Sequence, residues 1–211
     1  MRQIVYNFPG VFFVIYMLAA FVWPSVRVYK RTGIKLLTFG ASDSAHDYIG
    51  KTFKAVLIVI PLSIIVFYSN WGVYKYLLPV YYLDDHAVKL SGLVLCLLSL
   101  AWTVAAQWQM GNSWRIGIDE QRPACLVTGG LFSLTRNPIF LGMIVTLIGL
   151  FLLLPNAVTF ITMVLGYILM QIQARLEEEF LSMNYGAQYT EYKRRVPRFT
   201  PLLNKLISQD I

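Results

Sequence analysis

The 211-residue sequence contains only two cysteines and two histidines. Cys96 lies inside an apolar run and Cys125 in a basic loop, so they do not form the framework of a small disulfide-stapled protein. His46 and His86 occur in different loops, and no group of His, Cys and carboxylate residues has the spacing of zinc ligands. We therefore expect neither a structural disulfide nor a bound metal.

Charged residues are also scarce, at 14% of the chain, whereas soluble domains carry about 25%. Hydrophobic residues make up 57% of the sequence, and the mean hydropathy is +0.58. This composition excludes an ordinary soluble domain and predicts an integral membrane protein. The net charge of +7 does not indicate a nucleic-acid partner, because the basic residues are divided among loops between apolar runs.

Long apolar runs define the expected fold, since a transmembrane helix needs about 20 predominantly apolar residues. Five segments qualify, at residues 5–23, 52–70, 87–109, 138–154 and 157–174. Only Pro155-Asn156 separates the last two, which predicts a tight antiparallel hairpin. The first run has no small-residue cleavage site, so we interpret it as a retained span. The prediction is an all-α integral membrane protein with about five transmembrane helices and a cytoplasmic C-terminal helical cap.

The whole chain is expected to form a single membrane domain. Residues 1–109 would supply three N-terminal spans, and residues 110–211 a ligand-binding loop, the hairpin and a tail. All Lys and Arg residues except Arg2, Lys75 and Lys89 fall on one side of this topology, which predicts an outside N-terminus and a cytoplasmic C-terminus. Small residues, including Gly142 and Gly149, recur in the third and fourth spans and predict close helix packing.

The fourth span begins at the turn Arg136-Asn137-Pro138, which follows Gly129-Gly130. Proline suits the first turn of a helix, because its missing N–H would be unbonded there anyway. A helix N-terminus next to glycines, which let the backbone approach a ligand closely, favours an anionic group. An ordinary helix cap with an arginine reaching the membrane surface explains the same residues.

The fifth span ends in three consecutive glutamates, starting at Glu177. Helical spacing places Gln173 and Glu177 on one face and Arg175 with Glu179 on another. A solvated charge run is the simplest interpretation, and exposed ion pairs contribute little stability. Carboxylates this close to a hydrophobic span can also face a cavity, where Glu177 and Glu178 could hold a ligand amine or ribose hydroxyls.

Together these two blocks resemble the isoprenylcysteine carboxyl methyltransferase family and its bacterial relatives, which are similar to phospholipid methyltransferases. The first family pattern, Gly-x-Tyr-x-x-x-Arg-His-Pro-x-Tyr-x-Gly, is matched by Gly130, Phe132, Arg136, Asn137, Pro138, Phe140 and Gly142. The second, Glu-Glu-x-x-Leu-x-x-x-Phe-Gly-x-x-Tyr-x-x-Tyr-x-x-x-Val-Pro, is matched by Glu177, Glu178, Leu181, Tyr185, Gly186, Tyr189, Tyr192, Val196 and Pro197. Two blocks in this order around a two-span hairpin are more specific than either alone.

The resemblance implies S-adenosylmethionine as the methyl donor and no metal. It implies transfer at the membrane surface to a lipidic or small hydrophobic acceptor that carries a carboxylate, amine or thiol. The donor-binding residues that it implies are Ala124, Cys125, Leu126, Val127, Gly130, Phe132, Asn137, Pro138, Ile139, Phe140 and Glu177. The implied catalytic residues are Arg136, Arg175 and Glu178; Gln173 stands where the family has a substrate-facing arginine, and Arg175 is the nearest arginine.

Two other functions stay open at this point. Membrane reductases of the sterol type resemble the family in their C-terminal part and use a nicotinamide cofactor, although they would be expected to have more spans. A non-catalytic lipid-binding scaffold could also keep this fold. Saturable binding of S-adenosylmethionine without binding of nicotinamide dinucleotides would separate the three functions.

Overall fold

The computed structural model describes residues 2–33, 45–69, 71–111 and 125–199. Within these ranges the chain is helical, and its strand-like pairing is one isolated bridge between Pro79 and Asn156. The main helices are α1 (Arg2–Met17), α2 (Trp23–Thr32), α3 (Ala45–Ser69), α4 (Trp71–Tyr74), α5 (His86–Met110), α6 (Pro138–Leu153) and α7 (Ala157–Arg195). Short helices are η1 (Leu18–Val22), η2 (Lys75–Leu77), η3 (Tyr81–Leu83) and η5 (Gly130–Ser133). The predicted all-α class is confirmed.

Four helices in the described ranges are long and apolar enough to cross a membrane, namely Tyr6–Arg31, Tyr48–Ser69, His86–Met110 and Ala157–Arg195. Helix α6 is shorter, with 16 residues. At 1.5 Å per residue it measures about 24 Å, against a hydrocarbon core of about 30 Å. Four of the five predicted spans are therefore matched. The crossing of α6 and the orientation of the chain stay predictions.

The first membrane helix continues past Trp23, where the predicted span ended, because the Trp-Pro pair does not break it. Pro24 has no N–H to donate to the Ala20 carbonyl, and the chain passes through the π-helical turn η1 at this point. The Gln107 side chain of α5 donates to the Ala20 oxygen at 2.7 Å instead. Both residues are buried, so this hydrogen bond ties the first helix to the end of α5.

Helices α5 and α6 pack through small residues, as predicted. A Cβ atom on Gly92 would lie 2.8 Å from the Gly149 carbonyl oxygen, so a larger residue there would force the helices apart. Ser99 and Thr146 share a buried hydrogen bond of 2.8 Å across the same interface. The tight hairpin is also present, because the Asn156 side chain caps α7 by accepting from the Thr159 amide at 3.0 Å.

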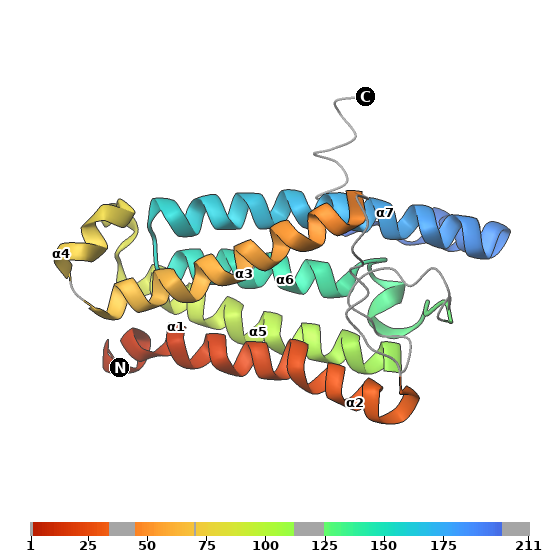
Figure 1. The fold of residues 1–211 in the computed structure, drawn as a ribbon, viewed down its shortest axis with the longest axis horizontal. Coiled ribbons are helices and arrows are strands. Elements are labelled where there is room, and N and C mark those ends of the chain that lie inside the picture. Colours follow the sequence, from red (N-terminus) through yellow and green to blue (C-terminus); the bar gives the residue numbers. More distant parts are fainter. Residues whose placement is uncertain (1, 34–44, 70, 112–124, 200–211) are drawn as a thin grey trace.

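Helix α7 is much longer than its predicted membrane span. Its 39 residues would measure about 58 Å if straight, roughly twice the hydrocarbon core. We therefore take residues 157–174 as the part within the core, with Glu177 and later residues beyond it. At Gly186 the backbone is non-helical, with φ +49° and ψ −120°, a conformation suited to glycine. The chain then folds back, and Tyr189, Tyr192 and Val196 pack near Leu181 (Figure 1).

Candidate functional site

The candidate site lies at one end of the helical bundle. Figure 1 shows the start of α6, the ends of α2 and α5 and the projecting half of α7 at this end, while α4 lies at the other. The loop leading into α6 is held by α5, since the Gln109 side chain accepts from the Leu131 amide at 2.8 Å. Gly130 adopts φ +60° there, and a Cβ on it would lie 2.6 Å from the Gln109 Oε1 atom. Glycine is thus required at this close contact.

An ion pair joins the start of α6 to α7. Arg136 donates to Glu178 Oε1 from Nε at 3.1 Å and from Nη2 at 3.0 Å, and Nη2 also reaches Oε2 at 3.1 Å. The two side chains are 8% and 4% exposed. Arg198, which follows α7, binds the same carboxylate with Nε at 3.0 Å and Nη2 at 2.9 Å. Glu178 therefore connects three separate parts of the chain.

Backbone contacts complete this junction. The Arg136 amide donates to the Pro197 carbonyl at 2.9 Å. The Asn137 side chain donates to Glu178 at 3.1 Å and to the Arg198 carbonyl at 3.2 Å. A neutral histidine offers a single N–H and gains a second only when it is protonated, whereas the Asn137 amide group directs two N–H bonds from one nitrogen. Asn137 can thus bridge two acceptors at this position while staying neutral at every pH.

The two arginines decide the charge state of Glu178. Burial alone would raise the pKa of its carboxyl, but the hydrogen bond from Arg198 and the charges of Arg136 and Arg198 outweigh burial and lower that pKa. The hydrogen bond to Glu178 in turn raises the pKa of Arg198. A buried carboxylate with several charge-assisted donors stays ionised. Glu178 is thus a carboxylate at neutral pH.

Glu177, the neighbouring residue, has a different environment. The Gln173 side chain donates to its Oε1 at 3.2 Å, one helical turn earlier, which confirms that the two share a face. Burial raises the pKa of Glu177 to about 7, the hydrogen bond from Gln173 opposes the shift, and the Glu178 charge adds to it. Adjacent carboxyls therefore differ in role, and Glu177 is the one that changes protonation near neutral pH.

The other predicted site residues are not all brought to this junction. Arg175 is exposed and donates to the Gln171 side chain at 3.1 Å and to its carbonyl at 2.9 Å. Cys125 is exposed, whereas Phe132 is buried and its carbonyl accepts from the Tyr192 hydroxyl at 2.6 Å. Ala124 lies outside the described residues.

The remaining predicted donor-binding residues lie in the loop before α6 and in the first turn of α6. Leu126 packs beside Tyr189 and Tyr192, and Val127 next to it is half-buried. The Pro138 carbonyl accepts from Trp102 Nε1 at 2.9 Å. Ile139 and Phe140 follow Pro138 and pack into the apolar interior around Met143.

Sequence reasoning missed two residues that shape this end of the bundle. Arg198 directly follows the Val196-Pro197 pair that ends the second block, yet no pattern connected it to Glu178. Gln109 gave no signal, because a single glutamine at the end of an apolar helix is ordinary. Both act through contacts between distant parts of the chain, which only the fold defines.

Comparison with known proteins agrees with the sequence blocks. Residues 88–188 match the family model of the phospholipid methyltransferases. Protein-S-isoprenylcysteine O-methyltransferase B of Arabidopsis thaliana is 33% identical over 82 residues, which cover 37% of this chain and 41% of that protein. The matched region thus spans less than half of this relative. Residues 88–188, which match the family model, contain most of α5, all of α6 and most of α7, and with them Arg136 and Glu178. Over this region the chain is similar to phospholipid methyltransferases, and it is also similar to part of an isoprenylcysteine O-methyltransferase.

Proposed function

We propose that this protein is an S-adenosylmethionine-dependent membrane methyltransferase whose donor binds between the loop preceding α6 and the exit of α7. The observation that supports this placement most directly is the Arg136–Glu178 ion pair, which brings the two family blocks together. The similarity to phospholipid and isoprenylcysteine methyltransferases supports the reaction class. The chain shares less than half of its relative's length, so the donor and the acceptor are both part of the proposal.

The described residues fit a sulfonium nucleotide. Glu177 offers a half-buried carboxyl, which as a carboxylate would hold the donor's ammonium group or ribose hydroxyls. Phe132 precedes Asn137 in the sequence and Phe140 follows it. In this proposal their aromatic rings would face the sulfonium of the donor, and an aromatic face stabilises a nearby cation by about 0.5–2 kcal/mol. The loop at 125–127, Gly130 and the 137–140 segment would enclose the rest of the donor.

We assign Arg136 and Glu178 a positioning role in this proposal. Their direct catalytic roles, which the family resemblance implies, stay predictions. Both oxygens of Glu178 already accept from arginines, and Arg136 Nη1 donates to the Lys193 carbonyl at 3.0 Å. Groups engaged in this way hold backbone segments in place more readily than they exchange partners with a substrate.

The chemistry requires little from the protein beyond alignment and water exclusion. When bound, the donor supplies an electrophilic methyl group, which passes to a lone pair of the acceptor as the carbon–sulfur bond breaks. A carboxylate, thiolate or free amine acceptor needs no metal for this step. The protein needs to hold donor and acceptor in line and to exclude water from the reacting atoms. The buried junction around Glu178 would fix the two segments that bind the donor.

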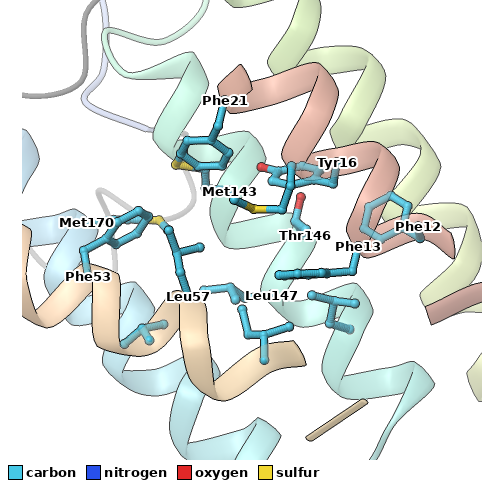
Figure 2. A pocket seen from close by; sticks show the side chains of 14 residues that line it. Phe12, Phe13, Tyr16, Phe21, Phe53, Leu57, Met143, Thr146, Leu147 and Met170 are labelled. Atoms are coloured by element: carbon cyan, nitrogen blue, oxygen red, sulfur yellow. The ribbon is translucent and has the colours of Figure 1, made fainter. Parts of the chain in front are cut away.

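An apolar cavity below the junction favours a lipidic acceptor. It lies between α1, α3, α6 and α7 (Figure 2). Its lining includes Met143, which lies between one and two helical turns after Pro138, and Met170, about two turns before Glu177. A chain entering this cavity would leave the acceptor's polar end near the proposed donor site. This arrangement supports a lipid over a small cytoplasmic molecule.

Methyl transfer can be tested in membranes that contain the protein. We expect incubation with methyl-labelled S-adenosylmethionine to label a molecule in the lipid extract, and Glu177→Ala to abolish this labelling in a folded protein. Glu179→Ala is the matched control, since Glu179 is an exposed carboxylate two residues away. Saturable binding of a nicotinamide dinucleotide would support the reductase instead. Binding of neither cofactor would favour a scaffold.

Arg175 is the proposed contact to the acceptor. Its exposed guanidinium lies two residues before Glu177, so we expect Arg175→Ala to reduce turnover more than donor affinity. The measurement compares the dissociation constant for the donor with the labelling rate at saturating donor. A loss of donor affinity with unchanged turnover would assign Arg175 to the donor.

A further inference from the structure

The end of α2 carries three basic residues on one face. Arg27, Lys30 and Arg31 have the i, i+3, i+4 spacing that places side chains together on a helix surface. Lys30 and Arg31 are exposed, and Arg27 is half-buried. Within the described part of the chain, none of the ion pairs includes any of these three residues. The cluster therefore presents positive charge and N–H donors that no described carboxylate neutralises.

Contacts with α5 hold Arg27 in place. Its Nη2 atom donates to the Gln107 carbonyl oxygen at 3.3 Å, and its Cζ atom lies 5.8 Å from the centroid of the Trp108 ring. Gln107 is one of the last four residues of α5, whose carbonyls lack partners within the helix. This contact engages one N–H of Arg27, and the guanidinium has further N–H groups for another acceptor.

An exposed apolar surface leads along α2 to the cluster. Trp23 precedes Arg27 by four residues and Val26 precedes Lys30 by four, so each pair shares a face of the helix. Trp23, Val26 and, on α5, Trp108 are exposed. The cluster ends a helix that is long and apolar enough to cross a membrane, at the level where tryptophan is enriched and lipid headgroups begin. This order, apolar and then cationic, is complementary to a phospholipid, whose acyl chains end at a phosphate.

We propose that Arg27, Lys30 and Arg31, beside Trp108, bind the phosphodiester of an anionic phospholipid whose acyl chains lie along Trp23 and Val26. Phosphate oxygens only accept hydrogen bonds, which suits guanidinium and ammonium groups. A zwitterionic phospholipid would bring its own ammonium group close to the same cations, so an anionic lipid should bind more tightly. Free phosphate would leave the exposed apolar face unused, and this face therefore favours a lipid.

Basic residues at the end of a membrane helix can also attract an anionic surface without forming a site. The last turn of α7 shows how such residues differ from the α2 cluster. Arg194 and Arg195 both pair with Glu191, and the exposed residues one turn earlier, Thr190 and Glu191, are polar. The end of α7 therefore lacks both the unneutralised charge and the apolar approach, and it serves as an internal control.

The proposed lipid would also contact the part of α5 that supports the candidate site. Gln109, two residues after Gln107, holds the loop that leads into α6. The proposal does not depend on methyl transfer, because lipid selectivity at α2 can be measured without donor or acceptor.

Competition between two lipids tests the proposal. The purified protein is held on a resin in neutral detergent with equal amounts of phosphatidylglycerol and phosphatidylcholine of the same acyl chains, and the bound lipids are quantified by mass spectrometry. We expect the wild type to prefer phosphatidylglycerol. The double variant Lys30→Gln/Arg31→Gln should weaken this preference about 5-fold for each removed charge, because a basic residue near an anionic surface contributes about 1 kcal/mol. Since both residues are exposed, the variant should unfold at the wild-type temperature.

Arg194→Gln/Arg195→Gln is the matched control, which removes the same charge at the same end of the bundle (Figure 1) and should keep the preference. Equal binding of both lipids by the wild type, or an unchanged preference in Lys30→Gln/Arg31→Gln, would overturn the proposal. Equal losses in the two double variants would also overturn it, because net charge alone would then attract the lipid. Sodium phosphate should release no more phosphatidylglycerol than sodium chloride of the same ionic strength. A larger release by phosphate would assign the cluster to a free anion and overturn the assignment to a lipid.

Discussion

Removal of the Glu178 carboxylate should lower the free energy of unfolding more than any other single substitution at the candidate site. In Glu178→Ala, the Arg136 side chain, only 8% exposed, would remain as a buried charge without its carboxylate. Breaking a buried ion pair in this way costs about 3–5 kcal/mol. Arg198 is 23% exposed and can be hydrated in part, so we expect the lower half of this range.

The expected loss is large enough to measure in detergent. For a chain of this size, 1 kcal/mol changes the melting temperature by about 2–4 °C, so the variant should melt about 6–16 °C below the wild type. Scanning fluorimetry can follow the unfolding, with Glu179→Ala as the control, which should stay within about 0.5 kcal/mol because Glu179 is exposed. Equal melting temperatures of Glu178→Ala and Glu179→Ala would refute the account of this junction.

The pH dependence of the Glu178 contribution has a defined sign. The folded-state pKa of Glu178 lies below the ordinary value of 4.5. The carboxylate therefore contributes its full stability above about pH 4.5, and this contribution is lost as the pH falls through the folded-state pKa. The difference between wild type and Glu178→Ala should be clear at pH 6 and shrink as the pH falls below 4.5. A difference that disappears near pH 6 would contradict the ion pairing.

Three further predictions concern neighbouring residues. Burial raises the pKa of Glu177 to about 7, so its ionisation destabilises the fold progressively above pH 4.5. The variant Glu177→Gln should therefore melt at a higher temperature than the wild type at pH 8, at the same temperature at pH 4, and bind the donor weakly. A melting temperature of the variant below that of the wild type at pH 8 would contradict this prediction. In Gly142→Ala the new Cβ would clash with Thr103 Oγ1 and cost about 1–3 kcal/mol. Thr103→Ala in the same chain should recover part of that loss, and simple additivity of the two changes would argue against the contact. Tyr192→Phe loses its hydrogen bond to the Phe132 carbonyl and should cost about 0.5–1.5 kcal/mol, with an unchanged unfolding midpoint as the contrary result.

The helices were predictable because their signals are local. The apolar runs and the Pro155-Asn156 breaker depend on neighbouring residues, and they gave α5 and the hairpin nearly as observed. The end of the first helix was not predictable in this way. A proline inside a helix normally ends or kinks it, because it cannot donate to the carbonyl one turn earlier. At Pro24 the helix continues, and the side chain of Gln107, which is distant in sequence, donates to the Ala20 carbonyl instead.

The candidate site was predictable as a set of residues but not as an arrangement. Arg136 and Glu178 were identified because ionisable groups at the ends of apolar helices are costly and unusual. Their mutual ion pair depends on how α7 packs against the start of α6. The participation of Arg198 depends on the reversal at Gly186, which returns the chain to the start of α6. A spacing rule along one helix cannot show which of two adjacent glutamates turns toward that reversal, and so the different environments of Glu177 and Glu178 appear only in the fold.

Donor binding tests the central claim most directly. We expect purified wild-type protein to bind S-adenosylmethionine saturably with one site per chain in calorimetry, and Glu179→Ala to bind it equally well. Glu177→Ala should show no binding although it unfolds cooperatively. Wild-type protein that does not bind S-adenosylmethionine, or a Glu177→Ala variant that binds it with unchanged affinity, would contradict a donor site between the start of α6 and the exit of α7.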